Sequence, residues 1–100
     1  MAKMIVMYDQ PRNKEGFEKY YNEVHIPLAE KVPNLKSAGV HHVLQTMNSD
    51  QQLYLIAELE FETPEILAKS LATPEAQEVQ GDLRNLMEFL NKPPVVAIVD

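Results

Sequence analysis

The 100-residue sequence contains no cysteine and no tryptophan, and it has only three glycines. The absence of cysteine excludes disulfides, thiolate metal sites and cysteine nucleophiles, and it agrees with a reducing compartment. So few glycines leave no glycine-rich phosphate loop and no dinucleotide-binding fingerprint. No serine lies in a context typical of a hydrolase nucleophile. The residues that are missing therefore exclude several large classes of enzyme.

Basic residues and long apolar runs are also scarce. Nine lysines and arginines stand against fifteen acidic residues, which gives a formal net charge of −6. This balance argues against nucleic acid or an anionic membrane as a partner. No apolar run approaches the roughly 20 residues that a membrane span needs, and the N-terminal run is too short for a signal peptide. We therefore expect one soluble, cytoplasmic domain over residues 1–100.

Four segments have the composition of β-strands. Lys3–Tyr8 and Val95–Val99 are apolar on both faces, as in the interior of a sheet. Lys36–Thr46 is a third strand, and a polar connector separates it from Gln52–Phe61, which alternates cleanly. In the strand Gln52–Phe61, one face carries Leu53, Leu55, Ala57, Leu59 and Phe61, and the other face carries Tyr54, Ile56, Glu58 and Glu60.

The first helix is predicted from Lys14 to about Lys31. Asn13 is its N-cap, and large apolar residues recur with the spacing of one helical face. Pro27 cannot donate to the carbonyl four residues earlier, so the helix kinks or restarts near His25. The segment is therefore an amphipathic helix with an imidazole beside its break.

Two repeated motifs open the remaining helices. Thr63-Pro64-Glu65 and Thr73-Pro74-Glu75 each place threonine at the N-cap and proline at the first helical position. They predict a short helix to about Leu71 and a longer one that Pro93 terminates. Gly81, in the middle of the longer helix, hints at a bend or a close approach.

The predicted order is strand, helix, strand, strand, helix, strand. This order is typical of the α+β ferredoxin-like fold (βαββαβ), in which a four-stranded antiparallel sheet carries both helices on one face. The other face would present bare aliphatic residues, which is an aggregation hazard. A second copy is the simplest cover, with the two sheets closing into a dimeric α/β barrel. We therefore expect a homodimer.

Several segments resemble the EthD family. Residues Phe17–Ala29 (Phe-Glu-Lys-Tyr-Tyr-Asn-Glu-Val-His-Ile-Pro-Leu-Ala) and Val32–Leu35 are similar to its first-helix signature, and Tyr54–Phe61 and Leu71–Gln77 are similar to its third strand and second-helix opening. The resemblance spans nearly the whole chain and implies the dimeric α/β barrel superfamily. The family is named after a protein encoded beside an ether-degrading monooxygenase system. More distant relatives include lactone isomerases and polyketide cyclases that use histidine and tyrosine as acid–base groups.

His25 and Tyr21 are the candidate catalytic residues. Imidazole exchanges protons near neutral pH, so a partly buried histidine can act as general acid or base. Tyr21 lies one turn before His25, where its phenol can orient a carbonyl or enol oxygen. The structural alternatives are a helix histidine bonded to a backbone carbonyl and a core tyrosine with its hydroxyl at the rim.

Three further residues are candidates for substrate binding. Tyr8, at the end of its strand, is placed to line a cavity mouth. His41 and His42 point to opposite faces of one strand, so only one of them, for which we take His42, can share the cavity. Glu58 lies beside Ile56 on the mixed face of its strand, where a carboxylate at a sheet–sheet interface would have a raised pKa or a cationic partner. Packing, solvent exposure and a surface salt bridge are the respective structural alternatives.

These residues predict an EthD-like catabolic protein that acts on a small apolar, carbonyl-bearing compound by cofactor-independent acid–base chemistry, such as isomerisation or cyclisation. One alternative is a non-catalytic ligand-binding or accessory protein of an oxygenase pathway. Another is a purely structural dimer module. We expect no cofactor and no metal, because the three histidines have no short ligand spacing.

Overall fold

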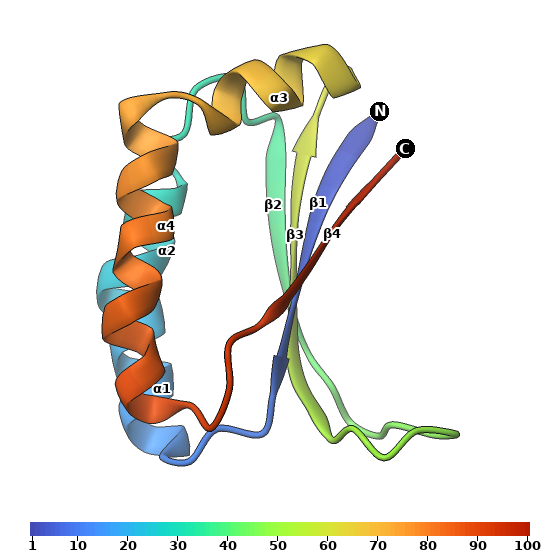
Figure 1. The fold of residues 1–100 in the computed structure, drawn as a ribbon, viewed down its shortest axis with the longest axis vertical. Coiled ribbons are helices and arrows are strands. Elements are labelled where there is room, and N and C mark those ends of the chain that lie inside the picture. Colours follow the sequence, from blue (N-terminus) through green and yellow to red (C-terminus); the bar gives the residue numbers. More distant parts are fainter.

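A four-stranded antiparallel sheet carries all of its helices on one face (Figure 1). The strands β1 (Ala2–Asp9), β2 (Ser37–His42), β3 (Leu53–Phe61) and β4 (Val95–Val99) lie in the order β2-β3-β1-β4. This is a computed structural model, and it describes all residues from 1 to 100. The predicted α+β, ferredoxin-like architecture is confirmed.

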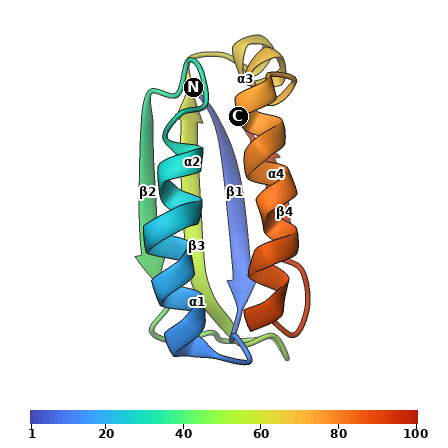
Figure 2. The same ribbon diagram turned by 90° about the vertical axis from the view of Figure 1, so that its left-hand side faces the viewer.

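The helical layer has two parts that lie side by side over the sheet. The first is a continuous run of α1 (Lys14–Tyr20), the π-helical turn η1 (Tyr21–His25) and α2 (Ile26–Ala29). The second contains α3 (Pro64–Leu71), α4 (Pro74–Leu86) and the 3₁₀ turn η2 (Met87–Phe89). Figure 2 shows β1 between α2 and α4 when the molecule is viewed from the helical side. None of the helices is long and apolar enough to cross a membrane.

Side-chain caps start the three main helices where the sequence predicted them. The side chain of Asn13 accepts a hydrogen bond from the amide of Gly16 at 2.9 Å. Thr63 and Thr73 each cap in the same way, at 3.1 and 3.2 Å, and each is followed by proline at the start of its helix. Such caps are each worth about 0.5–2 kcal/mol of stability.

The strand β2 is shorter than predicted, because it ends at His42 rather than at Thr46. The chain then forms an exposed connector that reaches away from the helical side of the sheet (Figure 1). Leu44 and Met47 of this connector are 99% and 71% exposed. Asn48 has a φ of 61°, a left-handed conformation that asparagine tolerates in turns.

A β-bulge in β3 changes the predicted direction of one side chain. Tyr8 and Asp9, which are neighbours in β1, pair with Leu55 and Leu53 of β3, so Tyr54 is the extra residue of the bulge. Strict alternation would place the Tyr54 side chain on the face of the sheet that points away from the helices. Instead, its ring lies edge-on to Phe17 of α1 and its hydroxyl donates to Glu18. The bulge therefore fastens this end of the sheet to α1.

Gly81 has no neighbour within 4 Å of the position that a β-carbon would take, so the predicted close approach does not exist within the chain. We expect Gly81→Ala to raise the free energy of unfolding by about 0.5–1 kcal/mol, because alanine loses less conformational entropy in a helix. Urea denaturation measures this change. In the control Gly16→Ala the new methyl group would lie 2.7 Å from ring carbons of Phe89, which opposes the same gain. A less stable Gly81→Ala protein would contradict the prediction.

Candidate functional site

A cavity of about 270 Å³ lies between the sheet and the helical layer. Its walls come from the helix-facing side of β1, β3 and β4 and from the inner faces of η1, α2, α3 and α4. Thirteen of its sixteen lining residues are hydrophobic, and none is a lysine, arginine, aspartate or glutamate. The lining residues are Met4, Val6, Tyr8, Tyr21, His25, Ile26, Ala29, Ala57, Leu59, Leu71, Val79, Gln80, Leu83, Pro94, Val96 and Ile98.

The π-helical turn brings His25 and Tyr21 to this cavity together. Because Pro27 has no amide hydrogen, the regular helical ladder cannot continue through it. The amide of Ile26 bonds instead to the carbonyl of Tyr21, five residues earlier. The rings of Tyr21 and His25 stack with centroids 5.5 Å apart and planes 22° apart. The helix break predicted near His25 is thus a local widening of the helix.

Asp82 of α4 holds the other side of the His25 ring. Oδ2 of Asp82 lies 2.9 Å from Nδ1 of His25. Oδ1 accepts hydrogen bonds from the Tyr20 hydroxyl at 2.5 Å and from the Asn85 amide at 2.9 Å. Burial would raise the pKa of Asp82, but hydrogen bonds from Tyr20, Asn85 and His25 outweigh it and hold the pKa below its usual value. The carboxylate is therefore charged at neutral pH.

Asp82 was not predicted from the sequence. It lies three residues after Val79 and four before Leu86, within the apolar stripe of α4, and only 6% of it is exposed. An acid at a core position of a helix requires a polar partner, because an unpaired buried charge is strongly destabilising. That requirement is the signal by which Asp82 could have been found.

Three polar atoms of the lining residues have no partner in the protein. The hydroxyls of Tyr8 and Tyr21 and Nε2 of His25 form no hydrogen bond, and none of them is a fully buried, unsatisfied atom. The three atoms therefore keep some solvent access, and the residues that carry them line the cavity. Burial raises the pKa of Tyr21 to about 12 and that of Tyr8 still further. Both phenols thus remain protonated at neutral pH and act as hydrogen-bond donors.

Comparison with known proteins identifies the family, because residues 10–89 match the EthD domain. The chain belongs to the EthD family. This EthD protein is 25% identical over 85 residues to an uncharacterised 11.0 kDa protein in the thcB–thcC intergenic region of Rhodococcus erythropolis, a match that covers 85% of this chain and 82% of the relative.

Solved structures agree with the EthD assignment. An EthD family protein from Bacillus halodurans C-125 has a TM-score of 0.87 and 28% identity, with coverage of 100% of this chain and 97% of that one. A dimeric protein of unknown function and ferredoxin-like fold from Bacteroides fragilis has a TM-score of 0.64 and 16% identity, with coverage of 99% and 94%. The latter match shows the fold alone.

Of the other predicted site residues of the EthD protein, His42 lies outside the cavity. Nε2 of His42 is 2.6 Å from Oε1 of Glu18 on α1, and the ring lies edge-on to Tyr54. Burial would raise the pKa of Glu18, but hydrogen bonds from Tyr54, His42 and Asn22 hold it below its usual value. This cluster joins α1 to the β2–β3 edge, and the structure gives His42 no contact with the cavity.

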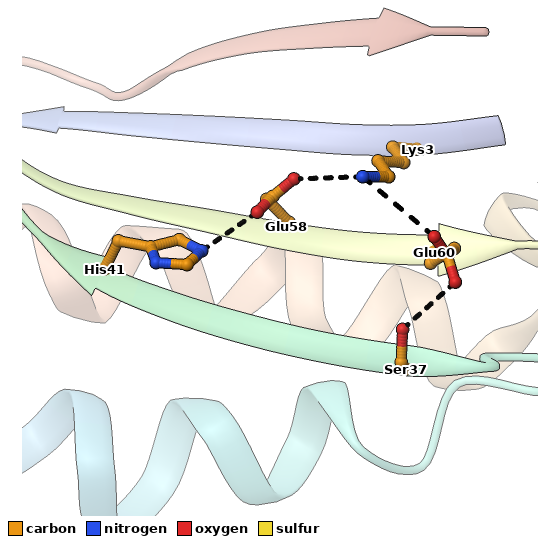
Figure 3. Close-up of polar contacts among 5 residues, drawn as sticks. All are labelled: Lys3, Ser37, His41, Glu58 and Glu60. Atoms are coloured by element: carbon orange, nitrogen blue, oxygen red, sulfur yellow. Dashed lines mark hydrogen bonds and ion pairs between the residues drawn. The ribbon is translucent and has the colours of Figure 1, made fainter.

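Glu58 lies on the outer face of the sheet, away from the helices (Figure 3). Nε2 of His41 lies 2.9 Å and Nζ of Lys3 3.4 Å from its carboxylate, and together they hold the pKa of Glu58 below its usual value. Lys3 also lies 4.0 Å from Glu60, which accepts a hydrogen bond from Ser37 at 3.3 Å. The cationic partner expected for Glu58 is therefore present, but the structure places this carboxylate outside the cavity.

The free energy of unfolding is expected to fall as the pH drops from about 6 to 3. In the folded protein the pKa values of Asp82 and Glu18 lie below the unfolded values of about 3.9 and 4.3. The stabilisation from both groups is present above the unfolded pKa values and is lost as the pH falls through the folded ones. Urea denaturation at several pH values measures the slope, which Glu18→Gln and Asp82→Asn should each make shallower. Unchanged slopes in both variants would contradict this account.

Proposed function

We propose that this EthD protein is a small-molecule catabolic protein that transfers a proton on an uncharged, carbonyl-bearing compound without a cofactor. One observation carries the proposal: Tyr8, Tyr21 and His25 bring polar atoms without a protein partner to a cavity whose lining is mostly apolar. A carbonyl oxygen accepts hydrogen bonds from the two phenols. The apolar walls bind the rest of the compound, and His25 serves as the acid–base group.

The charges around the cavity favour an uncharged ligand. No lysine or arginine lines the walls, so a carboxylate bound there would have no cationic partner. The nearest buried charge behind His25 is the carboxylate of Asp82, which would repel an anion. The ligand class is therefore a neutral ketone, ester or lactone with a largely hydrocarbon body.

The proposed reaction begins with removal of a proton from the carbon next to the carbonyl. Nε2 of His25 takes the proton, the electrons of the broken C–H bond form a C=C bond, and the carbonyl oxygen takes the negative charge. The hydroxyls of Tyr8 and Tyr21 stabilise that oxygen as donors. In a β,γ-unsaturated ketone, return of the proton from His25 to the γ-carbon of the conjugated enolate moves the double bond and isomerises the compound. In a dicarbonyl compound, attack of the enolate carbon on the second carbonyl closes a ring, and His25 returns its proton to the alkoxide that forms.

Solvent-deuterium exchange tests the proposal without knowledge of the natural substrate. The protein is incubated in D₂O with a panel of neutral aromatic and alicyclic ketones, and incorporation of deuterium beside the carbonyl is followed by mass spectrometry. We expect exchange above the buffer rate for the compounds that bind. Binding without exchange for every compound would overturn catalysis.

That result would favour the second candidate, a non-catalytic protein that holds or delivers a ligand in a degradation pathway. The position of the Rhodococcus relative in the thcB–thcC intergenic region supports a role beside the products of neighbouring genes. A compound that copurifies with the protein and is released chemically unchanged distinguishes this candidate from the enzyme.

We further propose that the EthD protein is a homodimer that pairs through the outer face of its sheet. Val95 and Val99 of β4 lie on this face and are 49% and 42% exposed. The β2–β3 connector, which contains the exposed Leu44 and Met47, extends from the same side of the sheet (Figure 1). The apolar part of this face lies along β4, whereas the part over β2 and β3 carries the polar cluster that His41 and Glu58 form with Lys3 of β1. An exposed apolar patch with a polar rim is typical of an interface. The dimeric state described for the relative from Bacteroides fragilis supports the proposal.

Val95→Glu is expected to shift the protein toward monomers, because the new carboxylate would be buried without a partner between the two sheets. Sedimentation velocity measures the shift over a range of protein concentrations. The matched control is Val24→Glu, which changes an exposed valine of η1 on the helical side. A wild-type protein that stays monomeric, or equal effects of the two variants, would contradict the proposed interface.

A further inference from the structure

We propose that Asp82 is a positioning residue that sets the tautomer of His25, so that the free electron pair of the ring lies on Nε2 and faces the cavity. The inference rests on the proposed function, in which Nε2 of His25 takes the proton. It concerns a separate property, however, because the tautomer of His25 can be observed without any substrate.

The chemistry of the pair fixes which nitrogen carries the hydrogen. An ionised carboxylate only accepts hydrogen bonds, so Nδ1 of His25, 2.9 Å from Oδ2 of Asp82, must donate. A neutral imidazole has a single N–H group, and its other nitrogen then holds the free electron pair. Nε2 is therefore the basic atom, and it is the ring nitrogen that has no partner in the protein.

The surroundings of Asp82 keep its carboxylate in one orientation. Tyr20 of α1 and Asn85 of α4 both donate to Oδ1, which leaves Oδ2 for His25. Asp82 is 6% exposed and does not line the cavity. It therefore acts through His25, and Tyr20 and Asn85 hold Asp82 in turn.

The other two histidines are an internal comparison, because each meets a carboxylate through the opposite ring nitrogen. Nε2 of His41 lies 2.9 Å from Glu58, and Nε2 of His42 lies 2.6 Å from Glu18. The same reasoning assigns the hydrogen to Nε2 in both rings. Among the three histidines of the chain, only His25 should thus be the Nδ1–H tautomer.

Long-range ¹H–¹⁵N correlation spectra of protein labelled at histidine test this assignment. At alkaline pH, where the rings are neutral, we expect one Nδ1–H ring and two Nε2–H rings. The variant His25→Gln removes one set of signals and identifies the ring. The inference is overturned if His25 itself is the Nε2–H tautomer, and this wild-type result decides it even where a variant fails to fold.

Asp82→Asn removes the charged carboxylate but keeps a side chain of nearly the same size and shape. Asparagine presents either its oxygen or its amide to Nδ1, so the Nδ1–H form of His25 should fall from nearly complete to a mixture. Tyr20→Phe, which removes a donor but keeps the carboxylate, should leave the Nδ1–H form dominant. Retention of a pure Nδ1–H ring in Asp82→Asn would show that another group sets the tautomer. If the tautomers are as expected but no ketone exchanges deuterium, only the proposed function fails.

Discussion

His25→Gln is expected to lower the rate of deuterium exchange of an active ketone by a factor of about 10²–10⁴, the usual contribution of a general acid–base group. Glutamine offers an amide hydrogen to the buried carboxylate of Asp82, but it cannot accept a proton from carbon. The exchange rate should therefore fall strongly while the melting temperature changes little. Exchange followed by mass spectrometry and thermal unfolding followed by circular dichroism measure the two effects.

The matched control for this variant is His42→Gln. His42 has the same side chain and also contacts a carboxylate, but it lies at the exposed edge of the sheet, outside the cavity. Its replacement should leave the exchange rate close to the wild-type rate, because His42 does not line the cavity in which the ketone is proposed to bind. An equal loss of deuterium exchange in both variants would show that His25 has no specific role in the exchange.

Phe17→Ala is expected to lower the free energy of unfolding by about 3–5 kcal/mol. The side chain is completely buried, and its ring stacks on Tyr21 at 5.2 Å and lies edge-on to Tyr8 at 5.3 Å. Alanine would leave a cavity beneath the two phenols of the site. For a domain of this size the loss is a large part of the total stability. Urea denaturation measures it directly.

The control for the Phe17 prediction is Phe89→Ala in η2. Phe89 is only partly buried and packs at the margin of the same cluster, so its truncation should be clearly less destabilising. A Phe17→Ala protein that is no less stable than Phe89→Ala would contradict the packing described here. Because Phe17 supports Tyr8 and Tyr21, its loss should also weaken ligand binding.

The architecture could be predicted because local patterns specify each element. The repeated Thr-Pro-Glu motifs start α3 and α4, and the alternation in β3 identifies its buried face. The bulge at Tyr54 could not be predicted in this way, because it depends on how β3 pairs with β1. A rule of strict alternation therefore misplaced that side chain.

One part of the candidate site could likewise be predicted from local sequence, and another part depends on tertiary packing. His25 and Tyr21 are four residues apart on one helical turn, so their proximity follows from local spacing. Asp82 lies 57 residues from His25, and only the packing of α4 beside η1 brings the two side chains together. The alternation in β3 predicts the outer face for Glu58, and the cavity lies on the opposite, helix-facing side of the sheet.

If the cavity binds an uncharged carbonyl compound through Tyr8 and Tyr21, a comparison of three ligands of similar size should reveal it. Calorimetric titration should show that acetophenone binds the wild-type protein more tightly than ethylbenzene does, and that benzoate does not bind. Tyr8→Phe and Tyr21→Phe should each lower the affinity for acetophenone by about 2- to 10-fold, as expected for the loss of one hydrogen bond. Benzoate binding as tightly as acetophenone, or no effect of either tyrosine, would contradict the account.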